Sequence, residues 1–339
     1  HIYSFKKKRI YYYKNLNTTQ KIQSLIIFSM FSVIFPGQGS QTVGMAENLY
    51  KEYSYIKELF DKADDILGVP LSKIILTGPK EKLNETENTQ PAIFLVSYSI
   101  YEVIKKETDI DLSKAKYFAG HSLGEYSALS ASGSIDFNST LKLLQKRGRS
   151  MQSAVPKGEG GMLAILGEKI ENIKEIFINN KDAFECYIAN DNSNGQIVVS
   201  GKNKDLESLI IELKKKSIKN IKLPVSAPFH CKLMSPATEI MQNEIFNTKF
   251  KDSNNSIISN VTSKEMQKSG DIKDLLVKQI ESPVRWRESI IYMINNNVKN
   301  FVEIGPGKIL SGMIKRIDRN VNIVSVNELD DIKNISFND

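Results

Sequence analysis

The segment KYFAGHSLGEYSALSASG, residues 116–133, contains the turn around which the rest of the chain is organised. Its spacing predicts a short strand over Lys116–Ala119, a sharp turn over Gly120–Gly124, and a helix over Glu125–Ser132 that Gly133 closes. A G-x-S-x-G turn between a strand and a helix presents a serine hydroxyl at the top of an α/β sheet. The segment therefore predicts an α/β fold with Ser122 as a candidate nucleophile.

The chemistry of the turn supports this interpretation of Ser122. A helix N-terminus stabilises negative charge, and the amide of Leu123 can point at an oxyanion that develops beside the serine. The glycines at both ends are needed because a turn this tight leaves no space for side chains. The alternative is a glycine-rich turn in which the serine is incidental.

A nucleophilic serine needs a base, and the chain has only three histidines. His1 lies in the N-terminal segment, and His121 precedes Ser122, so its side chain should point away from the hydroxyl and pack behind the turn. His230 remains, in a loop with the sequence Ser226–His230. By elimination it is the candidate base, although a single loop histidine is more often an ordinary surface residue.

Arg147 is the third informative side chain. On a helix over Ser139–Met151 it lies about 70° from the centre of the apolar stripe, whereas Arg149 lies about 130° away. Arg149 should therefore be solvated, while Arg147 borders the buried side and needs an anionic partner. That partner is either a structural carboxylate or a substrate carboxylate, which a guanidinium binds bidentately.

The remaining pattern predicts two domains. Strands alternate with helices in residues 31–154 and again in 227–330, which is typical of a parallel-sheet α/β domain. The helices that we expect there include residues 46–67, residues 282–295 and one that starts at Pro91 after a polar loop. Residues 155–226 have a βαββαβ order, the signature of a ferredoxin-like unit, and we expect them to form a small inserted domain. The pattern thus predicts a large parallel-sheet α/β domain with a ferredoxin-like insert.

Composition limits the other possibilities. The chain has 339 residues, of which 41% are hydrophobic and 25% charged, with a net charge of +7. Two distant cysteines favour neither a disulfide framework nor a metal site. Residues 1–46 contain six basic and no acidic side chains, so the charge excess is concentrated there and a nucleic-acid function is disfavoured. We interpret residues 1–30 as a basic transit remnant; a secretory leader and a disordered basic tail are the alternatives.

Taken together, the motifs resemble the malonyl-CoA:acyl carrier protein transacylases of type II fatty acid synthesis. The likeness runs from Phe31 to about Val326 and keeps the order of seven motifs: FPGQGSQ (35–41), NTQPA (88–92), GHSLGEY (120–126), QKRG (145–148), APFH (227–230), SPVRW (282–286) and EIGPG (303–307). Each motif alone is weak, whereas their joint order and spacing is specific.

The resemblance implies an α/β-hydrolase-like fold for the large domain, beside the ferredoxin-like insert, and a role for particular residues. Ser122 would be the nucleophile, His230 its base, and Arg147 the group that holds the malonyl carboxylate. Gln279 would orient the histidine through its backbone carbonyl, in place of a triad carboxylate. Backbone amides of Gln38 and Leu123 would form the oxyanion hole, and the acyl and CoA pocket would be lined by Gln90, Asn190 and Asn192, with Phe229 favouring malonyl over methylmalonyl groups.

The implied reaction is ping-pong transfer of a malonyl group from malonyl-CoA to the phosphopantetheine thiol of acyl carrier protein. It needs no cofactor or metal, and the implied partner is a small acidic carrier protein; we expect a monomer, with no nucleic-acid or membrane partner. A basic leader on such an enzyme favours a plastid of the apicoplast type, with a mitochondrion as the alternative. Two rival functions are a serine hydrolase, which predicts a triad Asp or Glu, and a carrier-docking module whose catalytic residues are lost.

Overall fold

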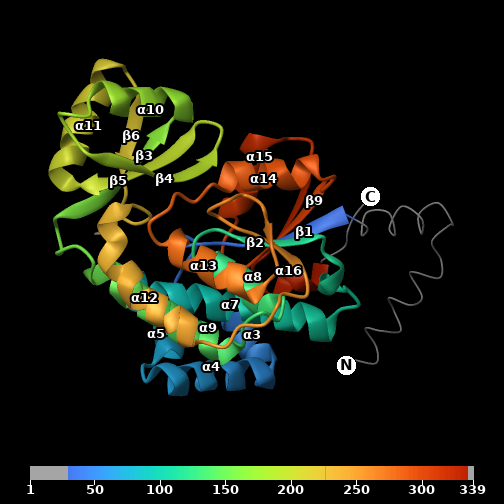
Figure 1. The fold of residues 1–339 in the computed structure, drawn as a ribbon. Helices are drawn as coiled ribbons and strands as arrows, with labels where there is room; N and C mark the ends of the chain where they lie inside the picture. Colours follow the sequence, from blue (N-terminus) through green and yellow to red (C-terminus); the bar gives the residue numbers. More distant parts are fainter. Residues whose placement is uncertain (1–29, 226, 335–339) are drawn as a thin grey trace.

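The computed structural model describes residues 30–225 and 227–334, which form two sheets and the helices around them (Figure 1). The basic leader that we predicted for residues 1–30 lies outside the described residues except for Met30. Within these ranges, none of the helices combines the length and apolar character needed to cross a membrane.

The larger sheet has six strands in the order β10-β9-β1-β2-β7-β8. Five of them run parallel, and only the short β8 pairs antiparallel with its neighbour β7. Their bounds are β1 Phe31–Phe35, β2 Tyr117–Gly120, β7 Ser256–Ile258, β8 Glu265–Met266, β9 Asn300–Ile304 and β10 Asn322–Val326. The carboxyl ends of parallel strands meet at one edge, where α/β proteins place their ligands.

Both faces of this sheet are covered, so its central strand β1 is buried along its whole length. Val33 and Phe35 pack into one apolar cluster, and Ile34, on the opposite face, packs into another. The helices α14 (Trp286–Asn295) and α15 (Ile309–Ile317) cover the face of Ile34 (Figure 1).

The opposite face carries most of the helices. They include α7 (Thr86–Glu107), α8 (Gly124–Ala131), α9 (Phe137–Ser153), α12 (Ser235–Asn247), α13 (Ser269–Gln279) and the peripheral α3 (Glu47–Glu52), α4 (Ser54–Leu67), α5 (Leu71–Thr77), α6 (Lys80–Asn84) and α16 (Leu329–Asn334). Figure 1 shows α7 and α9 beneath the sheet, with α3 and α4 outside them. This layer positions α8, α9 and α13 near the carboxyl ends of β1 and β2.

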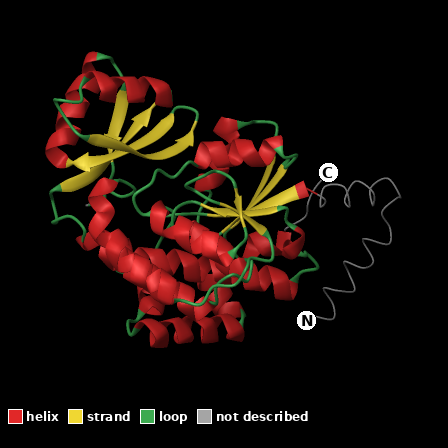
Figure 2. Cartoon of the chain, viewed as in Figure 1, coloured by secondary structure: helices red, strands yellow, loops and turns green. Residues whose placement is uncertain are grey.

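The second sheet has four antiparallel strands in the order β4-β5-β3-β6 and lies apart from the first (Figure 2). Its elements follow the chain as β3 (Gly160–Leu166), α10 (Ile170–Asn179), β4 (Cys186–Ser193), β5 (Gln196–Lys202), α11 (Asn203–Lys215) and β6 (Lys219–Lys222). This is the predicted βαββαβ order, and α10 and α11 pack on one face through Leu163, Ile165 and Val199. The predicted fold class is therefore confirmed, whereas the exact domain boundaries remain predictions.

Several predicted elements were wrong in detail. The helix expected over residues 46–67 is interrupted at Tyr53, whose extended backbone (φ −119°, ψ 115°) separates α3 from α4. The helix expected over 282–295 begins only at Trp286, because Val284 pairs with Asn190 of β4 as an extended bridge. We did not predict α5, α6, α12, β8, β10 or α16.

The polar stretch before Pro91, which we expected to be a loop, is the first part of α7. Its polar side chains are buried and bond to the preceding backbone: Asn88 Nδ2 donates to Lys82 O (2.9 Å) and Thr89 Oγ1 to Leu83 O (2.6 Å). Hydrogen bonding therefore makes this polar composition compatible with a buried helix. As a consequence, Gln90 lies on a rigid helix that faces α9.

Candidate active site

The turn between β2 and α8 is built by glycines that cannot be replaced. A Cβ on Gly120 would lie 1.9 Å from the backbone of Gly124, and one on Gly124 would lie 2.3 Å from Phe35 O. Ser122 between them has a left-handed backbone (φ 54°), which is strained for a serine. Strain of this kind is typical of a functional turn, and here it presents the Ser122 hydroxyl at the carboxyl end of β2.

Ser122 and His230 form a hydrogen-bonded pair, as we predicted. The serine Oγ lies 2.8 Å from His230 Nε2, and His230 Nδ1 lies 2.9 Å from the backbone carbonyl of Gln279 at the end of α13. Because a carbonyl only accepts, Nδ1 carries the proton, and Nε2 is free to accept from the serine. Burial, helped by the nearby charge of Arg147, lowers the pKa of His230 to about 3, so the imidazole is a neutral base.

Arg147 lies beside this pair and is only 1% exposed, which confirms that it faces the buried side of α9. Its Nη1 donates to Gln90 Oε1 (2.9 Å), and its Nη2 donates to Gln279 Oε1 (2.9 Å) and to Ser122 Oγ (3.2 Å). All three acceptors are neutral, and Arg147 makes no ion pair with any residue that the structure describes. Its Nε is buried and has no hydrogen-bond partner in the same residues.

The position of Arg147 depends on close packing of α9 against α7. A Cβ on Gly148 would lie 2.5 Å from Thr86 O, so this glycine lets the two helices approach and brings Arg147 to Gln90. Arg149, by contrast, is exposed and pairs with Glu87 at the surface, as its helical position predicts. Burial lowers the pKa of Arg147, but an arginine side chain keeps its proton in proteins.

The resemblance implies two backbone amides as oxyanion donors, that of Leu123, which follows the serine in the chain, and that of Gln38 in the loop after β1. The loop of Gln38 packs directly on the turn, because a Cβ on Gly37 would lie 2.5 Å from His121 O. The amides of Gly124 and Glu125 are used to close the turn on His121 O and Ser122 O, and the amide of Ser122 donates to Asn260 Oδ1 (2.8 Å). Leu123 N–H and Gln38 N–H therefore stay the candidate donors to an oxyanion.

The remaining predicted pocket residues lie on the small-domain side. Asn190 and Asn192 are buried on β4, and Asn192 Oδ1 lies 2.8 Å from Nε2 of His121. His121 points away from Ser122, as expected, and packs edge-on against Trp286. Phe229 is buried before His230, and its carbonyl accepts from Ser200 Oγ (2.6 Å). The structure thus joins Ser122, His230, Gln279, Arg147 and Gln90 in one hydrogen-bond network, and Asn192 belongs to a neighbouring one.

Two residues of this network, Glu125 and Asn260, were not predicted from the sequence. Glu125 is fully buried, and its Oε2 accepts from Gln279 Nε2 (2.7 Å) and from Asn260 N (3.1 Å). Asn260 Nδ2 in turn donates to Gly120 O (2.8 Å). Asn260 could have been found as a polar residue shortly after β7, at the carboxyl edge of the sheet. Glu125 belongs to the GHSLGEY motif, but no spacing in the sequence separates its role from that of an ordinary acidic residue in the first turn of a helix.

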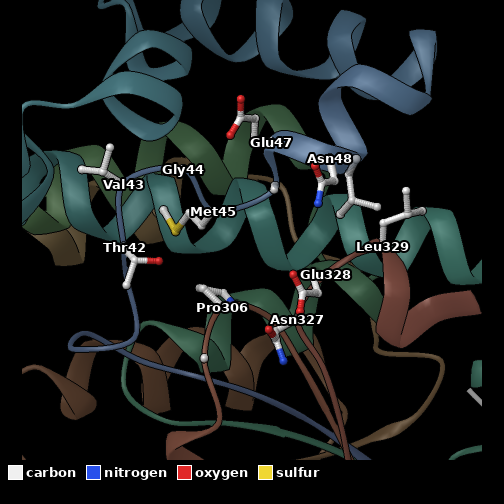
Figure 3. Close-up of a pocket in the computed structure, with 13 residues that line it drawn as sticks. Thr42, Val43, Gly44, Met45, Glu47, Asn48, Pro306, Asn327, Glu328 and Leu329 are labelled. Atoms are coloured by element: carbon white, nitrogen blue, oxygen red, sulfur yellow. The ribbon is translucent and has the colours of Figure 1, made fainter. Parts of the chain in front are cut away.

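A separate hollow of about 370 Å³ lies beside the loops that follow β1, β9 and β10 (Figure 3). Its lining consists of residues 42–49, 306–307 and 327–329, and none of the network residues contributes to it. It is therefore not part of the candidate active site. No group of His, Cys, Asp or Glu side chains in the described part of the chain could hold a metal ion.

Comparison with known proteins gives one consistent result. Residues 32–329 match the model of the acyl transferase domain family. The malonyl CoA-acyl carrier protein transacylase of Bacillus subtilis is 42% identical over 308 residues, which cover 90% of this chain and 96% of that protein. The corresponding protein of Haemophilus influenzae is 40% identical over 300 residues, which cover 88% of this chain and 96% of that protein.

Solved structures agree with this result. The acyl-carrier-protein-S-malonyltransferase of Bartonella henselae superposes with a TM-score of 0.86 at 38% identity, covering 89% of this chain and 97% of that one. A malonyl-transacylase solved in complex with its type II PKS acyl-carrier protein also superposes with a TM-score of 0.86. It is 35% identical, and the match covers 90% of this chain and 98% of that one.

The α/β fold, the strained serine turn and the serine–histidine pair are those of an enzyme with a serine nucleophile, and the comparisons show that its class is the acyltransferases. Given the extent of these matches, the chain belongs to the acyl transferase family, and within it to the malonyl CoA-acyl carrier protein transacylases. The resemblance inferred from the seven motifs is therefore confirmed.

Proposed function

We propose that this enzyme transfers a malonyl group from malonyl-CoA to the phosphopantetheine thiol of an acyl carrier protein, through a malonyl ester on Ser122. One observation carries the proposal. A buried arginine without a carboxylate partner among the described residues has its Nη2 3.2 Å from the serine hydroxyl. A guanidinium in that setting favours an acyl group that brings its own carboxylate.

In the first half-reaction the Ser122 oxygen attacks the thioester carbon of malonyl-CoA while His230 Nε2 takes the hydroxyl proton. The tetrahedral oxyanion is stabilised by the N–H group of Gln38, in the loop after β1, and by that of Leu123, the N-cap of α8. The C–S bond then breaks, and the proton passes from His230 to the departing CoA sulfur. The product is a malonyl-serine ester and free CoA.

The second half-reaction reverses these steps with a different thiol. His230 takes the proton of the phosphopantetheine thiol, the sulfur attacks the ester carbon, and the serine oxygen leaves with the proton from His230. The neutral imidazole supports both roles, because it begins and ends each half-reaction unprotonated. No cofactor enters the proposed sequence of steps.

Specificity follows from the acceptors around Arg147. The guanidinium would exchange at least one of its contacts with Ser122, Gln90 and Gln279 for the malonyl carboxylate. An acetyl group offers no such acceptor and leaves the buried cation without an anion, so acetyl transfer should be much slower. Gln90, Asn190, Asn192 and Phe229 are proposed to line the remainder of the acyl and CoA path.

A serine hydrolase is the main alternative. It predicts a carboxylate on the second ring nitrogen of the histidine, whereas the partner of His230 Nδ1 is the backbone carbonyl of Gln279. A docking module with a spent active site predicts loss of the nucleophile, the base or the arginine, and all three are present and in contact. Both observations favour the transferase.

Partner and location are further parts of the proposal. The carrier should be small and acidic, and a basic rim that includes exposed lysines of 214–222 is a reasonable docking surface. Reversing these charges should slow transfer to the carrier and leave acylation by malonyl-CoA unchanged. We further propose a monomer that acts in a plastid of the apicoplast type, with a mitochondrion as the alternative; fusing residues 1–46 to a fluorescent protein tests the location.

Intact-protein mass spectrometry tests the reaction itself. Mixing with malonyl-CoA and quenching quickly should add one malonyl group to Ser122, and holo carrier protein should remove it as the carrier gains the same mass. Ser122→Ala should abolish the adduct. The control is Ser127→Ala, because Ser127 is a buried serine in α8 whose Oγ has no hydrogen-bond partner in the described residues. An adduct that clears equally fast in buffer would identify a hydrolase.

A further inference from the structure

The carboxyl group of Glu125 lies immediately behind the nucleophile. It belongs to the first turn of α8, three residues after Ser122, and is 0% exposed. The carboxyl group accepts two hydrogen bonds, from Asn260 N and from Gln279 Nε2, and both go to the same oxygen, Oε2. The other, Oε1, is buried without a hydrogen-bond partner in the described residues. A buried carboxyl is costly, so its retention in this place requires an explanation.

The contact between Glu125 and Gln279 determines the orientation of the Gln279 side-chain amide. Its Nε2 donates to Glu125 Oε2 (2.7 Å) and to Ser122 O (3.1 Å), which leaves its Oε1 to accept from Arg147 Nη2 (2.9 Å). A reversed amide would place its NH₂ against the guanidinium, donor against donor, and its oxygen against the Glu125 carboxyl. The acceptor at Glu125 therefore determines that a carbonyl oxygen faces Arg147.

The contact with Asn260 reaches the serine turn by a second path. Glu125 holds the backbone N–H of Asn260, whose side chain accepts from Ser122 N and donates to Gly120 O. The Asn260 amide thus bonds the turn on both sides of His121. Its orientation is set by these two partners and needs no help from Glu125, so we expect Glu125 to act on this path less strongly than on Gln279.

We infer that Glu125 is a positioning residue that orients Arg147 toward the malonyl carboxylate, acting through the side chain of Gln279. This role rests on the proposed function, because it concerns the selection of malonyl over neutral acyl groups. Among the described residues Glu125 makes no hydrogen bond to Ser122 Oγ or to His230, since its hydrogen bonds go to Asn260 and Gln279. Its loss should consequently disturb acyl selectivity more than the reactivity of the serine.

The test compares Glu125→Ala, Glu125→Gln and a matched control. Glu303 is also a fully buried carboxyl, but it accepts from Leu310 N and Ser311 N away from the site, so Glu303→Gln controls for the loss of a buried charge. For each variant we would measure acylation by malonyl-CoA and by acetyl-CoA, and labelling of Ser122 by a neutral fluorophosphonate. The probe reports the assembled serine–histidine pair without involving a carboxylate.

Glu125→Ala should lower the malonyl-to-acetyl ratio of acylation rates by about tenfold, the effect of one lost orienting hydrogen bond, with labelling by the probe close to wild type. Glu125→Gln keeps an oxygen acceptor for the same two donors and should keep the ratio, as should Glu303→Gln. Parallel loss of malonyl acylation, acetyl acylation and labelling in Glu125→Ala would show a merely structural role and overturn the inference. So would an unchanged ratio.

The same measurements separate this inference from the proposed function. A wild-type enzyme that reacts with the fluorophosphonate but shows no preference for malonyl-CoA would refute the proposed function, and the role of Glu125 with it. A wild-type enzyme with a strong malonyl preference that Glu125→Ala leaves intact would refute the role of Glu125 alone. If Glu125→Ala does not fold, loss of the malonyl preference in folded Glu125→Gln would also count against an orienting hydrogen bond.

Discussion

The imidazole of His230 is oriented by the backbone carbonyl of Gln279, which accepts from Nδ1 at 2.9 Å. A carbonyl fixes the tautomer as a carboxylate would, but it adds no full negative charge to stabilise an imidazolium. Arg147, close by and buried, disfavours that cation further. The resting site therefore contains a neutral base, His230, and a fixed positive charge, that of Arg147, which is available to the acyl group.

This relationship predicts that Ser122 stays reactive far into the acidic pH range. Because burial and Arg147 lower the pKa of His230 to about 3, the imidazole should remain unprotonated at pH values well above 3. The rate of Ser122 labelling by a neutral fluorophosphonate should be constant from roughly pH 5 to pH 8. His230→Gln should slow labelling by roughly 10²–10⁴-fold, the usual contribution of a general base.

The reference value for this prediction is the pKa of a solvent-exposed histidine, which is about 6.5. A labelling profile for the native enzyme with a midpoint near that value would show that His230 is solvated in solution. It would contradict the buried position described above.

Arg147 should determine the choice of acyl group. Arg147→Ala leaves the substrate carboxylate buried without a partner, so we expect acylation by malonyl-CoA to fall by about 10²–10³-fold and acylation by acetyl-CoA to change by less than about tenfold. Arg147→Lys restores the charge but not the planar fork and should recover only part of the loss.

Arg149 provides the matched control for this pair of variants. It lies two residues away on α9, but it is exposed and pairs with Glu87 at the surface, where an ion pair contributes little. Arg149→Ala should leave both acylation rates within about threefold of wild type. Equal losses for malonyl and acetyl groups in Arg147→Ala would show that Arg147 only supports the fold.

Much of this site could be predicted from the sequence because its chemistry is tied to local patterns. The G-x-S-x-G spacing located Ser122, the scarcity of histidines located His230, and the helical angle separated Arg147 from Arg149. The inferences on Ser122 and Arg147 depend on residues within one or two turns of the chain, whereas that on His230 depends on the small number of histidines. The βαββαβ order of the small sheet was also predicted from local patterns.

What could not be predicted depends on contacts distant in sequence. Glu125 meets Gln279 across 154 positions, and Asn260 meets Gly120 across 140, so no local spacing records either contact. The polar start of α7 was misassigned because its side chains bond to the preceding turn, which only the folded chain reveals. Helices such as α12 were missed because their apolar patterns are weak.

The pKa of Glu125 leads to a prediction about stability. Burial raises the pKa of this carboxyl from 4.5 to about 7. Between these values the native protein holds a proton that the unfolded chain has released, so the carboxyl reduces native stability as the pH rises through this window. Gln at this position cannot titrate.

The stability of Glu125→Gln relative to wild type should therefore increase from pH 4.5 to pH 7, by about 3 kcal/mol in all, and change little outside that window. Urea denaturation of both proteins at several pH values measures this difference. Other titrating groups, His230 included, are present in both proteins and cancel. A difference that is independent of pH would show that Glu125 keeps an ordinary pKa.

Close packing of α9 on α7 gives the last prediction. Gly148→Ala places a Cβ 2.5 Å from Thr86 O, so the helices must separate, at a cost of about 1–3 kcal/mol in the free energy of unfolding. The separation would also move Arg147 away from Gln90 on the facing helix, so KM for malonyl-CoA should rise while labelling of Ser122 by a neutral probe changes little. Gly312→Ala is the matched control: it lies in α15, where a Cβ meets nothing within 4 Å, and the substitution should stabilise the helix by up to about 1 kcal/mol. If Gly148→Ala were as stable and as active as Gly312→Ala, the approach of the two helices would not be what places Arg147 beside the nucleophile.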